Sequence, residues 1–547
     1  MEIQTMKKLE EEALKKSGTD FTRLGFALFF MIGVLTFSFL SNGGIPNNMF
    51  LAVAALIGAY MAMNIGANDV ANNVGPAVGS KAMTMTMAIM IAAIFEAAGA
   101  LIAGGEVVKT IKKGIIDISA FGGNADPFIW AMMAALLAAA LWLNFATMMR
   151  APVSTTHSIV GGVMGAGIAA AGFSIVDWGT MAKIAASWVI SPVLGGVIAA
   201  AFLFSIKKSI VFQDDKVAAA KKWVPVFVAV MSWAFVTYLT LKGLKKIWPQ
   251  IVELLNYLPL VSIEMSKKPS LLTALVMGGL VAIAVFFSVR MRLTSNKKVL
   301  ENTKASVNTL FTIPLVFAAA LLSFAHGAND VANAIGPLAA INDAVVNGGI
   351  SSKASIPLWV MGVGALGIAL GLALYGPKLI KTVGTEITEL DQIRAFSIAM
   401  AASITVIIAS QLGLPVSSTH IAIGGVFGVG FLREYLQLND TTTIEEDKSI
   451  IKDEKSNLHA YKSELEKLEK KDEKSTFEYE RVVELYKLIV DEEKLIKSTK
   501  RHIKQTKKVE YVKRDAVKKI IAAWLITVPA AAVLAALLFF MIKGIML

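Results

Sequence analysis

Two short motifs that could bind ions each occur twice in this sequence. The first, GANDVAN with Gly-Pro two residues later, covers residues 66–76 and again residues 327–337. Its aspartates, Asp69 and Asp330, lie inside long apolar segments, where an ionised carboxylate is costly unless it is paired. Carboxylate and carboxamide oxygens suit hard cations. We therefore expect a site for Na⁺ or H⁺ that includes Asn68, Asp69, Asn72, Asn329, Asp330 and Asn333.

Each copy of this motif pairs an aspartate with an asparagine at spacing i, i+3, so that the two side chains share one helix face. Na⁺ itself is accordingly expected at Asp69, Asn72, Asp330 and Asn333. The competing interpretation is a polar seam between packed helices, because Asn and Asp also bond across helices. The duplication favours the ion site.

The second motif joins a proline to a hydroxyl cluster, as PVSTTH at 152–157 and PVSSTH at 415–420. This pattern is typical of a helix start, where hydroxyls cap and the first backbone N–H groups lack partners. Those groups and the positive end of the helix dipole attract anions. The alternative is that each motif only caps a buried helix. The duplication favours a tetrahedral oxyanion held by hydroxyls and backbone amides at Ser154, Thr155, Thr156, Ser417, Ser418 and Thr419.

Two carboxylates and an anion can share a buried site only when cations offset their repulsion and desolvation. The sequence therefore predicts that Na⁺ or H⁺ enters with the anion. Further candidates for this site are Glu96, His157, Gln411 and His420. His326 precedes only the second GANDVAN copy and receives lower weight.

Composition indicates a membrane protein with many spans. The 547 residues are 55% hydrophobic and only 17% charged, which argues against a soluble enzyme. The absence of cysteine excludes disulfides and iron–sulfur clusters, and no resident cofactor is expected. The net charge of +12 fits lysines in cytoplasmic loops better than a nucleic-acid partner.

Apolar segments long enough to cross a bilayer define an all-α architecture with about 11–12 membrane segments. Two longer apolar regions, 128–172 and 396–431, are interrupted by the proline–hydroxyl motifs and predict re-entrant or broken helical hairpins. Trp248–Ile263 is too polar to span and is predicted as a loop. The uninterrupted segments are Gly25–Ser41, Leu51–Asn73, Thr84–Gly104, Lys183–Ile206, Trp223–Leu241, Leu271–Val289, Leu310–Ile335, Pro357–Tyr375 and Ile520–Ile542.

The two motifs recur at offsets of 261 and 263 residues, which identifies the chain as a duplicated unit. Basic loops place the N-terminus in the cytoplasm. The two GANDVAN segments then cross in opposite directions, as in the inverted-topology repeats of secondary transporters, whose sites lie near the membrane midplane. We expect a multi-pass protein of the cell membrane.

The charge is concentrated near the C-terminus, where residues 445–519 hold 18 acidic and 21 basic side chains. Apolar residues at heptad spacing there predict a soluble, cytoplasmic helical hairpin. The expected organisation is an N-terminal segment with an extra helix (1–50), a first repeat (51–206), a connection (207–308), a second repeat (309–435), the charged insertion (436–519) and a final helix that completes the second repeat (520–547).

The doubled GANDVAN and the PVSTTH and PVSSTH motifs closely resemble those of the inorganic phosphate transporter (PiT) family, over nearly all of residues 51–435 and the last helix. The resemblance implies an inverted-repeat carrier, commonly a homodimer, that moves inorganic phosphate together with Na⁺ or H⁺ by alternating access. It also implies that Asp69, Asn72, Asp330 and Asn333 hold cation and phosphate, and that the two hydroxyl clusters bind phosphate. The extra helix at 25–41 and the insertion depart from a minimal member of that family.

Other functions remain open from the residues alone. A permease for sulfate or another oxyanion, or a metal–phosphate/H⁺ symporter, would use similar chemistry. Two membrane aspartates could form the dyad of an intramembrane aspartyl protease. The Asn-rich motifs, without Gly-x-Gly-Asp at either aspartate, favour binding over catalysis. The chain is therefore not expected to be an enzyme, and it has no Walker motif for ATP-driven transport.

Overall fold

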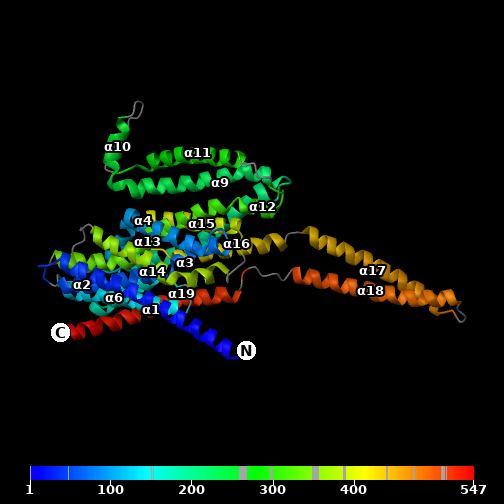
Figure 1. Ribbon diagram of the computed structural model, residues 1–547, viewed down its shortest axis with the longest axis horizontal. Coiled ribbons are helices and arrows are strands. Elements are labelled where there is room, and N and C mark those ends of the chain that lie inside the picture. Colours follow the sequence, from blue (N-terminus) through cyan, green and yellow to red (C-terminus); the bar gives the residue numbers. More distant parts are fainter. Residues whose placement is uncertain are drawn as a thin grey trace. The chain divides into compact units, whose positions relative to one another are not determined.

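The computed structural model describes residues 2–46, 48–122, 124–149, 151, 153–257, 268–295, 300–347, 356–385, 390–438, 441–471, 475–506, 512 and 514–547. Within them the regular structure is helical, apart from one isolated bridge between Ile116 and Val176 (Figure 1). The α-helices are α1 (Glu2–Ser41), α2 (Asn48–Asn68), α3 (Val70–Gly79), α4 (Met85–Ala103), α5 (Gly105–Lys113), α6 (Ala125–Met148), α7 (Thr155–Ala171), α8 (Trp178–Ile206), α9 (Lys216–Tyr238), α10 (Trp248–Asn256), α11 (Leu271–Ser295), α12 (Lys304–Thr309), α13 (Thr312–Val346), α14 (Leu358–Thr385), α15 (Gln392–Gln411), α16 (Ser418–Leu438), α17 (Thr441–Glu469), α18 (Thr476–Thr506) and α19 (Arg514–Met546). Short 3₁₀ or π segments are η1 (Ile118–Phe121), η2 (Phe173–Ile175), η3 (Lys207–Val211), η4 (Leu239–Gly243) and η5 (Leu244–Lys246).

Eleven helical segments in the described residues are long and apolar enough to cross a membrane. Each of the nine uninterrupted segments expected from the sequence lies within one of them, to within one residue at either end. Each interrupted region forms two helices, α6 with α7 and α15 with α16, joined by a turn at the proline–hydroxyl motif. The protein is therefore an all-helical, multi-pass membrane protein. Pro152 and Arg150 of the first turn lie outside the described residues.

The prediction of a loop over Trp248–Ile263 was wrong for its first part. Residues Trp248–Asn256 form α10, a helix of 9 residues whose apolar side chains lie mainly on one face. It is too short to span a bilayer, which requires about 20 residues. Its polar residues and Pro249 exclude a span but allow a short helix, because proline is tolerated in a first helical turn. Residues 258–263 lie outside the described part of the chain.

The two GANDVAN copies differ in backbone. In the first, α2 ends at Asn68 and α3 begins at Val70, so that Asp69 lies at the junction of two helical segments. In the second, α13 continues through Asp330 and through Pro337 without interruption. Both copies carry the same glycines and Gly-Pro, yet only the first is interrupted, and the interruption lies at the aspartate.

Helices of one repeat pair with helices of the other through glycines. A Cβ atom added at Gly66 would lie 2.0 Å from the Ile368 carbonyl oxygen, so that α2 directly contacts α14. Its counterpart in the second motif, Gly327, brings α13 equally close to Glu96 on α4, with 2.2 Å to that carbonyl oxygen. Small residues allow such approach between membrane helices. The duplicated glycines thus hold the two halves together.

The second pair of helix contacts follows the same plan. A Cβ atom at Gly165 on α7 would lie 2.1 Å from the Ala532 carbonyl oxygen on α19. On α16, Gly428 is equally close to Gly196 on α8, at 2.0 Å from its carbonyl oxygen. α7 and α16 are the equivalent helices that begin at the two hydroxyl clusters. Each packs against the membrane helix that follows its equivalent in the other half, α19 for α7 and α8 for α16.

The two copies of the acidic motif run antiparallel. Gly58 on α2 lies against Leu338 on α13. Just after the end of α2, Asp69 lies within hydrogen-bond distance of the Thr155 hydroxyl, as does Asp330, which precedes Leu338 in the sequence. Residue numbers therefore rise along one motif while they fall along the other, as an inverted-topology repeat requires.

The charged segment forms a separate unit. Contacts divide the chain into Gly430–Lys513 and the remainder, 1–429 with 514–547. Within the first of these, α17 and α18 pack antiparallel around Leu465, Leu485 and Ile489. Arg481 bridges the two helices by bonding to Glu464 at 2.9 Å. The subdivision of the remainder at 51, 207, 309 and 520 stays a prediction.

The contact of Gly165 with α19 provides a test of this packing. Ala is the best helix former, so that Gly→Ala stabilises a helix wherever there is space for the methyl group. At Gly165 the methyl would overlap a backbone carbonyl and should destabilise the protein by about 1–3 kcal/mol. Gly165→Ala should therefore lower the thermal unfolding midpoint in detergent.

The matched control is Gly279→Ala on α11, where nothing lies within 4 Å of the added carbon. This variant should unfold at or above the temperature of the parent protein. Equal midpoints for the two variants would contradict the close contact between α7 and α19.

Candidate ion and oxyanion site

Both proline–hydroxyl motifs begin a helix, as the sequence predicts. Ser154 caps α7 by accepting a hydrogen bond from the His157 N–H at 3.1 Å. Ser417 accepts the equivalent bond from the His420 N–H at 3.2 Å, at the start of α16. These caps fix the helix starts. The next hydroxyls, those of Thr155, Ser418 and Thr419, are thereby placed at the two N-termini.

These hydroxyls bond to the two predicted aspartates. Asp69 accepts from Thr155 at 2.7 Å and from Thr419 of the other repeat at 2.8 Å. Asp330 lies 3.2 Å from both the Thr155 and the Ser418 hydroxyl oxygens. A hydroxyl has one proton, so that Thr155 can donate to only one carboxylate at a time. All five side chains are buried, with at most 1% exposure.

The asparagines of the motif complete a network across the repeats. Asn72 donates to the Thr419 hydroxyl at 2.9 Å. Asn333 donates to the hydroxyls of Thr155 and Thr156, each at 3.1 Å. Thr156 in turn donates to the Val416 carbonyl at 2.9 Å. Each asparagine therefore reaches the hydroxyl cluster of the opposite repeat.

Oxygen atoms in this network lack donors within the part of the chain that the structure describes. A buried acceptor without a partner costs about 1–3 kcal/mol. A cation would satisfy several of these oxygens at once, and the donor set is the hard one that Na⁺ prefers. The residues present therefore fit a cation. The unpaired oxygens are the Oδ1 atoms of Asn68, Asn72, Asn73, Asn329, Asp330 and Asn333.

Asn68 and Asn329 take a different role from the other amides. Asn68 donates to the Thr147 hydroxyl at 2.9 Å and lies 3.3 Å from the Ala151 carbonyl oxygen. Asn329 bonds in the same way to Ser410 and Leu414. Their amide nitrogens therefore fasten each motif to the turn before a hydroxyl cluster, instead of pointing at the carboxylates.

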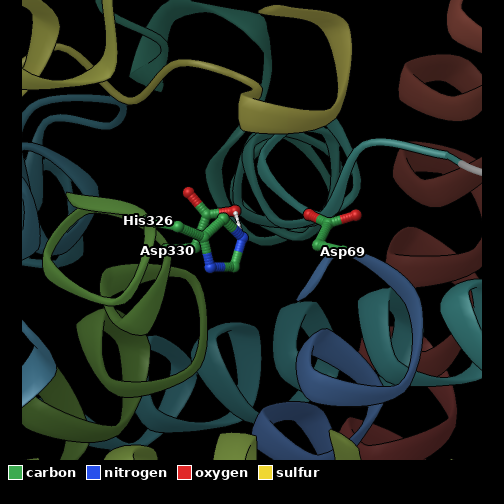
Figure 2. Close-up of side chains that lie close together, drawn as sticks. All are labelled: Asp69, His326 and Asp330. Atoms are coloured by element: carbon green, nitrogen blue, oxygen red, sulfur yellow. Dashed lines mark ion pairs between the residues drawn. The ribbon is translucent and has the colours of Figure 1, made fainter. Parts of the chain in front are cut away.

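A third carboxylate extends the site on one side. Glu96 accepts from Asn73 at 2.7 Å and lies 2.7 Å from His326 Nδ1. His326 Nε2 lies 3.1 Å from Asp330 Oδ2. Figure 2 shows the His326 ring beside Asp330, with Asp69 across from them. Ligand atoms of Asp69, His326 and Asp330 all lie within 4.8 Å of one another.

This chain breaks the symmetry of the duplication. At the offset of 261 residues, His326 corresponds to Ile65, and Asn73 corresponds to Ala334. Glu96 contacts the glycine of the second motif, whereas the equivalent glycine of the first contacts Ile368. Sequence reasoning named Glu96 but gave His326 low weight. The sequence signal for His326 was that each copy of the motif has a polar residue, His326 or Asn73, where the other copy has an apolar one. The packing of α4 against α13 shows that both polar residues contact Glu96.

His157 and His420 lie in an aromatic stack. Their ring centroids are 4.5 Å apart. Trp188 lies 3.7 Å from the first ring, and Trp524 lies 3.6 Å from the second. Neither ring is paired with a site carboxylate in the described residues. Gln411 ends α15, and its buried Nε2 lacks an acceptor within the same part of the chain.

Comparison with known proteins agrees with this arrangement. A profile of the Phosphate transporter family matches residues 65–535. A Helicobacter pylori (strain J99) protein, named a candidate phosphate permease, is 49% identical over 544 residues, covering 98% of each chain. One from Thermococcus kodakarensis with the same description is 38% identical over 392 residues, which cover 71% of this chain and 90% of its own.

A solved structure titled "The sodium-dependent phosphate transporter" matches with a TM-score of 0.68 and 30% identity. The match covers 91% of this chain and 99% of that one. The profile match extends over most of the sequence and includes both acidic motifs and both hydroxyl clusters. This chain belongs to the phosphate transporter family.

Proposed function

We propose that this protein is a secondary active transporter that moves inorganic phosphate across the membrane together with Na⁺. The observation that carries the proposal is the meeting of two antiparallel acidic motifs with two helix N-termini at one buried site. Asp69 and Asp330 accept from Thr155, Ser418 and Thr419, which are the groups expected to bind a tetrahedral oxyanion. Family membership and the sodium-dependent structural neighbour support the same substrate and ion.

The hydroxyl groups have two alternative partners in this proposal. They now donate to the carboxylates, while phosphate would need the same protons. A cation that binds Asp69 or Asp330 would neutralise the carboxylate and release the hydroxyls for the anion. Helix N-termini supply further N–H donors for it. Cation binding therefore prepares the phosphate site.

Charge balance makes the coupling obligatory. Asp69, Asp330 and Glu96 are fully or almost fully buried and face only one imidazole, that of His326, among the titratable groups of the cluster. Adding a phosphate anion increases the negative charge further. Desolvated charges of one sign are strongly destabilising without counterions. Phosphate alone should therefore not bind.

Na⁺ accounts for the site better than H⁺. A proton could neutralise a carboxylate, but it would leave the unpaired carboxamide oxygens of Asn72 and Asn333 unsatisfied. A metal cation can coordinate carboxylate and carboxamide oxygens together. At the Glu96–His326 pair, H⁺ could take the place of Na⁺.

The inverted repeat suits alternating access, because exchanging the conformations of two equivalent halves turns one central site from one side to the other. In the proposed arrangement the protein spans the cell membrane with its N-terminus and the 430–513 unit in the cytoplasm. We further propose that it acts as a homodimer, which chemical crosslinking in native membranes would test.

Uptake into proteoliposomes tests the function. With purified protein, radiolabelled phosphate should accumulate when an inward Na⁺ gradient is imposed and should not when choline replaces Na⁺. An inward H⁺ gradient without Na⁺ should give little accumulation. Uptake driven equally by H⁺ alone would contradict Na⁺ coupling, and preferred uptake of sulfate, unaffected by excess phosphate, would contradict the substrate.

Removing either motif charge should abolish coupled uptake. Asp69→Asn and Asp330→Asn keep the size of the side chain but remove the charge that binds the cation. Losing one partner of a buried charge pair costs about 3–5 kcal/mol, so that uptake should fall by about two orders of magnitude or more. Asp453→Asn, in the separate charged unit, is the control. Wild-type uptake by either motif variant would exclude these residues from the site.

The asparagines should determine the Na⁺ requirement. Asn72→Ala removes one cation ligand and the bond to the Thr419 hydroxyl. One hydrogen bond contributes about 0.5–1.5 kcal/mol, so that the half-saturating Na⁺ concentration for uptake should rise about 2- to 10-fold. Asn333→Ala should behave alike, and exposed Asn457→Ala should not. An unchanged Na⁺ dependence in both variants would remove them from the cation site.

A further inference from the structure

A cavity of about 450 Å³ is lined by residues of α1, α2, α6 and α14, outside the site described above. Its wall on the repeat side carries several polar side chains among apolar ones, and Tyr60 lies beside the carboxamides of Asn64 and Asn144. Tyr375 and Lys378 on α14 add a phenol and an ammonium group. Most of the lining is apolar, but these side chains give water and an anion hydrogen-bonding and charged partners inside it.

The extra N-terminal helix closes this cavity from the outside. Leu24, Ala27 and Met31 of α1 line it at spacing i, i+3, i+7, along one helix face. They belong to the first half of the span Asp20–Ser41. The cavity therefore lies on the side of the membrane that carries the N-terminus.

The inner end of the cavity lies next to Asn68 of the first acidic motif. Thr147 lines the cavity and accepts the hydrogen bond of Asn68 at 2.9 Å. Asn68 is fully buried, and the next residue is Asp69. The Asn68–Thr147 contact therefore lies between the cavity and the residue that precedes the first motif aspartate.

The equivalent contact on the other half is covered by protein. Asn329 bonds to Ser410 at 2.9 Å, as Asn68 bonds to Thr147. Tyr238 of α9, only 1% exposed, lies beside Ser410. Thr110 donates to the Gly413 carbonyl at 2.7 Å in the adjoining turn. Side chains of α9 and α5 thus cover the Asn329 contact, whereas the Asn68 contact borders the cavity.

We propose that this cavity is the aqueous vestibule through which phosphate and its cations pass between the ion site and the membrane side of the N-terminus. The Asn68–Thr147 contact is its inner closure, and Lys378 supplies a positive charge that attracts the oxyanion. The face of α1 that bears Ala27 forms its outer wall. This inference rests on the proposed function, since it assigns a route to the same substrate.

The sequence contains no cysteine, so that single cysteines can be placed without other changes. Ala27→Cys puts a thiol in the cavity. Phe29→Cys, two residues along the same helix, puts one on the outer face, where Phe29 is 78% exposed. Both are reconstituted in liposomes and treated with a membrane-impermeant, sulfonated methanethiosulfonate, applied to each side in turn.

The Ala27→Cys variant should react at least about tenfold faster than Phe29→Cys, and only from the side of the N-terminus, because thiolates react in water and not in lipid. Saturating Na⁺ and phosphate should slow the reaction, and completed modification should block uptake in Ala27→Cys alone. Equal rates, no reaction, or reaction only from the opposite side would overturn the proposal.

The variant Lys378→Gln tests whether the positive charge of Lys378 attracts anions to the cavity. In the Ala27→Cys background it should slow the anionic reagent by severalfold and leave a cationic methanethiosulfonate unslowed, because it removes a positive charge at the entrance. Labelling by an apolar maleimide but by neither charged reagent would show a lipid-filled pocket and refute the vestibule. Labelling is read by mass spectrometry without transport, whereas uptake by the unmodified variant tests the proposed function separately.

Discussion

Carboxylates buried inside a membrane protein must be compensated, and this requirement explains more of the structure than any other interaction. Asp69 and Asp330 share one hydroxyl, that of Thr155, which has a single proton for the two of them. Glu96 and Asp330 share the ring of His326. Around them lie amide oxygens without donors among the described residues. A site with too few protons and too many acceptors is suited to receive metal cations, and only afterwards an anion.

The fold brings these groups together through backbone contacts. Gly66 and Gly327, equivalent residues of the two motifs, allow α2 and α13 to touch helices of the opposite half at distances that no side chain would permit. The Ser154 and Ser417 caps then start α7 and α16 at the carboxylates. In the proposed function, the symmetric part of the site binds the oxyanion and the cations. The asymmetric Glu96–His326 pair distinguishes the two halves and gives the site a single acidic extension.

Much of this could be predicted from the sequence, because duplicated motifs and apolar segments are determined by residues close together in the chain. The aspartates, the hydroxyl clusters and the helix starts depend on neighbouring residues, and the structure places them together. Other features depend on packing between distant segments. Glu96 meets His326 only because α4 lies beside α13, and His157 of α7 stacks on Trp188, which lies on α8. The continuous helix through Asp330 was also unpredictable, since the same Gly-Pro pattern follows the interrupted helix at Asp69.

The central claim is that cations must neutralise the carboxylates before the oxyanion binds. Calorimetric titration of phosphate into the purified protein, at fixed pH and ionic strength with Na⁺ progressively replacing choline, measures this directly. The account predicts that phosphate binds only in the presence of Na⁺, that its affinity rises with Na⁺ concentration, and that phosphate raises the affinity for Na⁺ by the same factor. Phosphate binding of equal affinity in choline and in Na⁺ would contradict it.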